Sequence, residues 1–284
     1  MVYAHEIPAG SRLYFGKSAA IKRDIEATAA RMLSEAGYEE IVTPYFSYHQ
    51  HESFDDTREL VRLNDEENHE VSLRADSTAD VIRIVTKRLG RSSEAKKWFY
   101  IQPVLSYPTK ESYQVGAETI GGAFAETAAD SVKLVRMLDL KPVMQLSNMR
   151  IPQLLMQRYG TDASALRSMH ISTLLETAPW MHKLVAVDSP EDLKDLSDYP
   201  DDIAAELDAL RRAAEAIGDA AVVIAPLYFA KLRYYDALLF RMIEGNRVIA
   251  MGGSYRIDDI EASGFALYTD ECIAWKMKEG KTDE

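Results

Sequence analysis

Apolar side chains recur with helical spacing near the start of the chain. Ile21, Ile25, Met32 and Leu33 fall on one face of a helix with 3.6 residues per turn, and Ser18 stands where an N-terminal cap belongs. The pattern therefore predicts a long amphipathic helix that begins just after Ser18 and buries one face.

The segment after this helix changes to a strand-like pattern. Gly37 can adopt the left-handed conformation that ends a helix, and the β-branched run from Tyr38 to Pro44 predicts a short strand. Further along, residues 61–74 predict a hairpin that turns at 65–68.

Later apolar runs predict more strands and helices. Strands are expected at 98–105, 113–119, 141–148, 221–225, 234–243 and 247–251, the last one ending at Gly252 and Gly253. Helices are expected at 77–89, 123–138, 201–217 and 269–278. Since consecutive strands joined by tight turns run antiparallel, this order predicts an α+β fold, an antiparallel sheet flanked by helices.

No linker divides the chain into separate parts. Pro/Gly/Ser-rich stretches and internal repeats are absent from the sequence. The chain has 284 residues and is 47% hydrophobic, enough for one large domain with a sizeable core. We expect a single domain over residues 1–284, with a mostly helical insertion at about 151–220.

Charge and cysteine content narrow the classes of function. A net charge of −12 is a poor match for a polyanion, so no nucleic-acid partner is expected. Cys272 is the single cysteine, which excludes an intrachain disulfide or a cysteine zinc site and is typical of a small buried apolar residue. His49 and His51 have no obvious third ligand, so neither a metal nor a cofactor is expected.

Targeting signals are not visible in the sequence. The first residues lack a basic region followed by an apolar stretch, and no run of 18 apolar residues occurs. A cytoplasmic protein without a membrane partner is the expectation.

Several motifs resemble those of histidyl-tRNA synthetases. Residues 73–78, Leu-Arg-Ala-Asp-Ser-Thr, resemble the L-R-P-[ED]-x-T turn of that family, and residues 99–121 resemble its motif 2. Residues 232–235, Leu-Arg-Tyr-Tyr, and 264–267, Gly-Phe-Ala-Leu, resemble two later motifs. The long first helix and the strand ending at Pro44 resemble motif 1, which builds the dimer interface of class II synthetases. The resemblance implies a class II synthetase-like fold and a self-dimer through this region.

Three positions depart from the family in the same way. Ser106, Ala230 and Glu271 stand where the resemblance implies arginines that hold ATP and substrate, and the motif 2 loop is shortened. Forming an aminoacyl-adenylate requires fixed cations that point at the phosphate oxygens, and losing one such donor typically costs roughly 10²–10³ in rate. We therefore expect the chain to be unable to activate an amino acid, and no catalytic residue is assigned.

The synthetase residues that bind the amino acid have closer counterparts in this sequence than the arginines that bind ATP. The resemblance implies a histidine-like ligand pocket formed by Asp76, Thr78, Gln114, Glu118, Tyr235 and Tyr255. Asp76 and Thr78 can accept from an ammonium group, Glu118 can accept from an imidazole N–H, and the tyrosines provide flat walls. The alternative is that these residues only pack the sheet, with their hydrogen bonds satisfied inside the protein.

One family combines these features. A synthetase-like chain without the ATP arginines, and expected to lack the anticodon-binding domain, resembles the regulatory subunit of ATP phosphoribosyltransferase. The resemblance implies a non-catalytic partner of the short catalytic subunit, which it activates, and feedback by histidine in the first step of histidine biosynthesis. Two alternatives stay open: a compact ATP-dependent amino-acid-activating ligase with a non-tRNA acceptor, and a tRNA-binding regulator.

Overall fold

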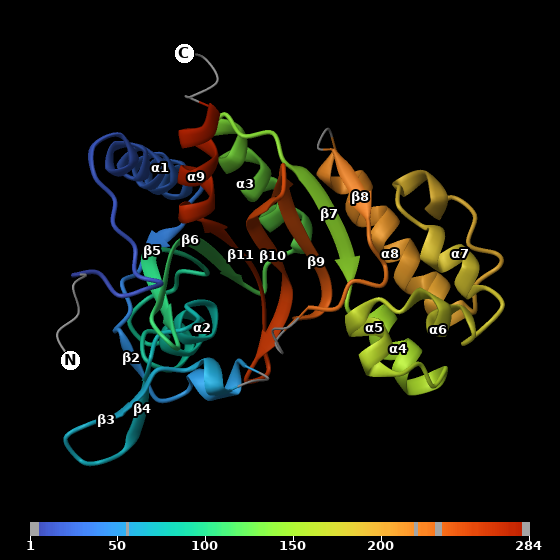
Figure 1. The fold of residues 1–284 in the computed structure, drawn as a ribbon, viewed down its shortest axis with the longest axis horizontal. Coiled ribbons are helices and arrows are strands. Elements are labelled where there is room, and N and C mark those ends of the chain that lie inside the picture. Colours follow the sequence, from blue (N-terminus) through green and yellow to red (C-terminus); the bar gives the residue numbers. More distant parts are fainter. Residues whose placement is uncertain (1–5, 55–56, 219–220, 231–234, 280–284) are drawn as a thin grey trace.

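An eight-stranded sheet runs through the middle of the molecule (Figure 1). The computed structural model describes residues 6–54, 57–218, 221–230 and 235–279. In spatial order the strands of this sheet are β1 (Glu39–Glu40), β5 (Lys97–Ser106), β6 (Lys110–Ile120), β11 (Ile260–Tyr268), β10 (Arg247–Ile257), β9 (Tyr235–Glu244), β7 (Val143–Asn148) and β8 (Val222–Ile224). The predicted α+β fold with a helix-flanked sheet is confirmed.

Two pairs of strands depart from the predicted antiparallel pattern. β1 runs parallel to β5 and β7 runs parallel to β8, while the other neighbours in the large sheet are antiparallel. β7 and β8 are joined by the long helical segment between residues 148 and 222, and such a connection permits parallel pairing where a tight turn does not.

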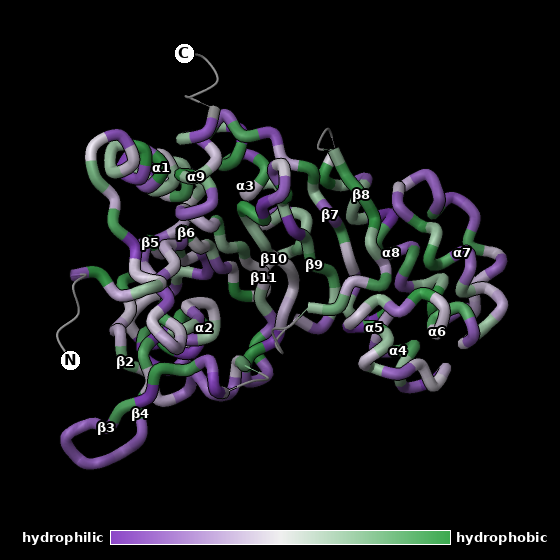
Figure 2. Tube along the Cα trace, in the orientation of Figure 1, coloured by the Kyte–Doolittle hydropathy of each residue, from purple (hydrophilic) through white to green (hydrophobic). Residues whose placement is uncertain are grey.

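A smaller sheet lies beside the large one. It contains β2 (Phe46–Ser47), β4 (Glu70–Leu73) and β3 (Arg62–Asn64), so the predicted hairpin at 61–74 is confirmed. The connection between β3 and β4 projects from the body and is hydrophilic (Figure 2). Two short 3₁₀ turns, η1 (Gln50–Glu52) and η2 (Thr57–Glu59), precede it.

Helices cover both faces of the large sheet. α1 (Gly16–Glu35), α3 (Phe124–Met137) and α9 (Thr269–Glu279) share a core with Phe240, whereas α2 (Thr78–Lys87) shares one with Leu239. Successive side chains of a strand point to opposite faces, so α2 and the three other helices lie on opposite sides of β9.

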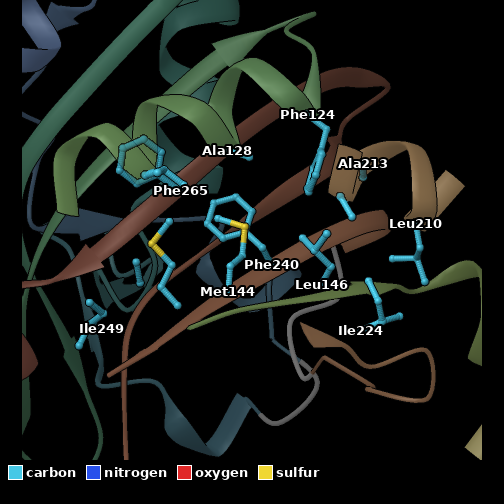
Figure 3. Close-up of a cluster of buried hydrophobic side chains, with 14 of the residues drawn as sticks. Phe124, Ala128, Met144, Leu146, Leu210, Ala213, Ile224, Phe240, Ile249 and Phe265 are labelled. Carbon is cyan, nitrogen blue, oxygen red and sulfur yellow. The ribbon is translucent and has the colours of Figure 1, made fainter. Parts of the chain in front are cut away.

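The main core lies between the sheet and the helices on the α3 side. Figure 3 shows side chains from α3, α8, β7, β8, β9, β10 and β11 meeting there. The rings of Phe124 and Phe240 meet edge to face, with their centres 5.9 Å apart. Cys272 is fully buried in the same core, as expected for a small apolar residue. In the part of the chain that the structure describes, no helix is long and apolar enough to cross a membrane.

The helices after β7 form the right-hand lobe in Figure 1. They are α4 (Arg150–Arg158), α5 (Ala163–Ser168), α6 (Ile171–Leu175), α7 (Met181–Ala186), the 3₁₀ turn η3 (Pro190–Leu193) and α8 (Asp201–Ile217). Their positions agree with the helical segment expected at about 151–220. The ring of Trp180 lies between those of Tyr159 and Tyr199 and packs these helices together.

Three local predictions were wrong. α1 begins at Gly16, and Ser18 lies inside it, where its hydroxyl accepts the Phe15 N–H at 3.1 Å. β10 does not end at Gly252 and Gly253 but continues to Ile257, and the sequence pattern missed β11 altogether. A Cβ on Gly252 would lie 2.6 Å from the Cβ of Phe265 on β11, so this glycine allows the two strands to pack closely.

The strand expected at 38–44 is shorter than predicted. Only Glu39 and Glu40 pair with β5, although Gly37, with φ of 84°, ends α1 as expected. Beyond Ile41 the backbone bonds to side chains instead, because the Thr43 N–H donates to Gln102 and two carbonyls accept from Arg74. These side chains replace the strand ladder.

Candidate functional site

The six residues expected to form a pocket lie around one small cavity. The cavity has a volume of about 100 Å³, lies on the α2 side of the large sheet, and is lined by Asp76, Thr78, Gln114, Glu118, Tyr235 and Tyr255, among others. They come from the start of α2 and from three strands, so the fold brings together positions up to 179 residues apart, from 76 to 255.

Glu118 forms the floor of the cavity. Its side chain is buried and accepts hydrogen bonds from the hydroxyls of Thr78 at 2.8 Å, Tyr100 at 3.3 Å and Tyr255. Burial is the largest influence and raises the pKa of Glu118 to about 8, although the hydroxyl hydrogen bonds act in the opposite direction. When ionised, the carboxylate offers about four lone-pair positions, so roughly one remains for a donor on a ligand.

Two glycines make room for this arrangement. Gly264 of β11 lies opposite Glu118, and a Cβ there would be 1.7 Å from the Glu118 carboxylate. Gly116 of β6 lies opposite Tyr100, and a Cβ there would be 2.0 Å from the Tyr100 ring. Any larger residue at Gly264 would displace Glu118, and any larger residue at Gly116 would displace Tyr100, which donates to Glu118.

Gln50 holds the loop that carries Asp76. Its side chain is fully buried, its Oε1 accepts the N–H groups of Ala75 at 2.9 Å and Asp76 at 2.7 Å, and its Nε2 donates to the Asp76 carbonyl and to Asp80. Asp76 in turn accepts the Ala79 N–H at 3.0 Å, which satisfies one of the free N–H groups at the start of α2. Sequence reasoning missed Gln50, because no local pattern links a residue in the 3₁₀ turn η1 to a loop 25 positions later.

Arg74, the arginine of the same turn, is structural. The residue is 1% exposed, and its guanidinium donates to the carbonyls of Thr43, Pro44 and Pro103. The guanidinium also stacks on Tyr45, with its carbon 4.7 Å from the ring centre. Desolvation by burial lowers the pKa of Arg74. This side chain ties the backbone at 43–44 to the backbone at 103 and has no ligand-binding role in our account.

Aromatic rings form the walls. Tyr235 and Tyr255 meet edge to face with ring centres 6.2 Å apart, and burial raises the pKa of both hydroxyls well above the usual value. Tyr268 and Phe54 also line the cavity and were not among the predicted residues. Of the motif at 232–235, only Tyr235 lies within the described residues.

A larger cavity of about 630 Å³ adjoins the first and shares with it the lining residues Phe54, Ala75, Gln114 and Tyr268. Ser106 and Glu271, two of the positions expected to have lost an arginine, line it. The third, Ala230, is 3% exposed in the core under α2, where its N–H contacts the sulfur of Met149 at 3.3 Å. The three positions therefore do not share one cavity wall.

The two arginines of the larger cavity face acidic groups, while Lys110 also lines it. Arg247 forms an ion pair with Glu271, and Arg12 lies 4.0 Å from Asp270. These pairs neutralise positive charge that a triphosphate would otherwise use. Within the described ranges, no group of three or more His, Cys, Asp or Glu side chains could hold a metal ion.

Comparisons with a protein family and with a solved structure identify the fold of the chain. The protein-family model described as histidyl-tRNA synthetase matches residues 14–272. A crystal structure described as an ATP phosphoribosyltransferase regulatory subunit/histidyl-tRNA synthetase from Bacillus halodurans has a TM-score of 0.82 at 18% identity, covering 96% of this chain and 84% of that one. The fold and the cavity thus define a class II synthetase-like protein of the histidyl type.

Sequence relatives identify the family more closely. The ATP phosphoribosyltransferase regulatory subunit of Wolinella succinogenes is 44% identical over 275 residues, covering 96% of each chain. That of Helicobacter hepaticus is 42% identical over 275 residues, covering 96% of this chain and 98% of the other. The chain belongs to the family of ATP phosphoribosyltransferase regulatory subunits, whose members are regulatory and not catalytic chains.

Proposed function

We propose that this chain binds histidine in the small cavity and transmits its presence to a short catalytic ATP phosphoribosyltransferase subunit in the cytoplasm. Through this association it activates the catalytic subunit and carries feedback inhibition in histidine biosynthesis. The observation that carries the proposal is Glu118, a buried acceptor held by three hydroxyls at the floor of a cavity walled by tyrosines.

Histidine suits the chemistry of this cavity. An imidazole N–H can fill the remaining acceptor position on Glu118, and its flat ring fits between tyrosine faces. The ligand's ammonium group is placed at Asp76 and Thr78, with the Gln114 amide beside them. Gln114 has no side-chain hydrogen bond to any other described residue, so its amide is available to a ligand.

The neighbouring cavity supports a regulator better than a ligase. Because Arg247 is paired with Glu271, its guanidinium is not available to bind a phosphate. Ser106 offers only a hydroxyl. Transition-state charge on phosphate oxygens needs donors that are already aimed at it. We therefore propose that the chain does not form an aminoacyl-adenylate and does not bind tRNA.

A second proposal concerns self-association. Residues 42–48 follow the first strand and expose four large apolar side chains: Val42, Tyr45, Phe46 and Tyr48. Apolar groups gathered on a surface mark interaction sites. We propose that two copies of the chain pack through this motif 1 region, each then presenting one surface to a catalytic subunit.

Regulation requires that histidine bind one state of the complex more tightly than the other. The test is reconstitution with a short catalytic subunit, measuring transferase rate against histidine concentration for the wild-type chain and for Tyr255→Phe. We expect co-purification, activation without histidine, inhibition with it, and a weaker inhibition by histidine in the variant. Failure of the two chains to associate would contradict the proposal. Histidine inhibition that is equally strong for wild type and Tyr255→Phe would contradict it as well.

A further inference from the structure

Arg241 of β9 is a partly buried cation without a carboxylate partner among the residues that the structure describes. Its Nε donates to Gln145 Oε1 at 3.2 Å, its Nη2 contacts the same oxygen, and its guanidinium carbon lies 4.0 Å from the ring centre of Tyr228. These partners orient the group but carry no charge that would compensate its own. A partly buried charge is costly unless it is paired.

The position of Arg241 is beside the small cavity. It lies directly opposite Met251 of β10, a residue that lines the cavity, and paired residues of adjacent strands point to the same face of a sheet. Burial raises the pKa of Tyr268, another lining residue, to about 12, and the charge of Arg241 opposes that rise. The guanidinium therefore acts electrostatically on a group at the wall of the cavity.

This location complements the acidic end of the site. Asp76 and Glu118 lie toward α2 and β6, whereas Arg241 approaches from β9 on the other side of Met251. A free amino acid carries an ammonium and a carboxylate on one carbon, so it needs both kinds of partner. The ammonium and the side chain have partners under the proposed function, but the carboxylate has none.

We infer that Arg241 binds the carboxylate of the amino-acid ligand and so selects a free amino acid over its amine. The inference rests on the proposed function. It also accounts for Ala230: the loop that no longer supplies an arginine at 230 carries Tyr228, whose ring supports the guanidinium of the neighbouring strand. On ligand binding, one or both of the contacts to Gln145 give way to a forked contact with the carboxylate.

The role of Arg241 is tested by calorimetric titration of the full chain with two ligands, histidine and histamine. Histamine lacks the carboxylate. The wild-type protein should prefer histidine, and Arg241→Gln should weaken histidine binding roughly ten- to hundredfold while leaving histamine binding nearly unchanged. Arg241→Lys keeps the charge without the fork and should show an intermediate loss. Arg256→Gln, at an exposed arginine of β10, is the matched control and should behave as wild type.

The outcomes separate the inference from the proposed function. Wild-type protein that binds neither histidine nor histamine contradicts both. Wild-type protein that prefers histidine, with a preference that survives in Arg241→Gln and Arg241→Lys, contradicts the inference alone. Equal weakening of both ligands in these variants also overturns it, because it shows a structural role for Arg241. Should Arg241→Gln fail to fold, the lysine variant decides the matter.

Discussion

The Glu118 carboxylate and the backbone of Gly264 occupy adjoining space across two strands, such that a Cβ on Gly264 would lie 1.7 Å from Glu118 Oε2. No rotation of a well-packed strand can relieve that overlap without moving the carboxylate. The floor of the cavity therefore depends on the absence of a side chain at this one position.

A methyl group at this position should disrupt both the site and the stability of the protein. Gly264→Ala should lower the unfolding free energy by about 1–3 kcal/mol, the usual cost of overpacking. Denaturant unfolding measures the loss. In a Glu118→Ala background the same substitution should cost clearly less, because the nearest clashing group is gone, although the Ala117 carbonyl, 2.7 Å from such a Cβ, still opposes it. Additive losses in the double variant would show that the two residues do not compete for space.

The buried Glu118 should make stability depend on pH. Its folded-state pKa of about 8 lies above the ordinary value of 4.5, so the folded protein holds a proton that the unfolded chain releases. The associated stability is present below about pH 4.5 and is lost as the pH rises to about 8. The unfolding free energies of wild type and Glu118→Gln should be measured at pH values from about 5 to about 9, in steps of about one pH unit. The stability of the variant relative to wild type should rise up to about pH 8 and then stay constant.

An exposed carboxylate provides the control for that experiment. Glu94→Gln, in the loop before β5, should follow the wild-type pH dependence throughout. Parallel curves for wild type and Glu118→Gln would mean that Glu118 stays ionised in the folded protein.

The Arg74 guanidinium should be a large contributor to stability. Arg74→Met leaves the buried carbonyls of Thr43 and Pro103 without their donor, and hydrogen bonds to charged groups contribute about 1.5–3 kcal/mol each. We expect a loss of about 3 kcal/mol or more in unfolding free energy. Arg88→Met, at the exposed end of α2, should change it by less than about 0.5 kcal/mol. Similar losses for both would remove the structural role assigned to Arg74.

Glu271 should keep nucleotides out of the larger cavity. Glu271→Gln frees Arg247 from its ion pair, so ATP should bind more tightly than to wild type, by roughly tenfold at low salt, and the gain should shrink as salt rises. Fluorescence titration with a labelled nucleotide measures this. Glu261→Gln, exposed on β11, should have no effect. An unchanged affinity in Glu271→Gln would show that this ion pair does not limit binding.

Sequence patterns predicted correctly the elements that are determined by residues close together in the chain. The Ala-rich amphipathic run gave α8 at Asp201–Ile217, and the turn residues between two β-like runs gave the β3–β4 hairpin. Gly252 and Gly253 misled the prediction, because a glycine that permits close packing between strands cannot be told by its sequence from one that ends a strand. The β-branched run at 38–44 failed as a strand because Gln102 and Arg74 capture its backbone groups.

The residues of the candidate site were likewise predicted only in part from the sequence. Six lining residues followed from family motifs, and the structure places all six at one cavity. Gln50 and Arg241 could not be found in this way, since their roles arise from contacts with Asp76 and Gln145 across the fold. Such contacts leave no periodic or spaced signal along the chain. Whether the six bind histidine stays a prediction.

Calorimetric titration of the purified chain with histidine, in the absence of nucleotide, tests the central claim most directly. The account predicts saturable binding of one histidine per chain, with an affinity that ATP does not change and that Glu118→Gln weakens. No heat of binding, or binding that develops only when ATP is present, would contradict it, because the cavity would then serve a ligase or no ligand at all.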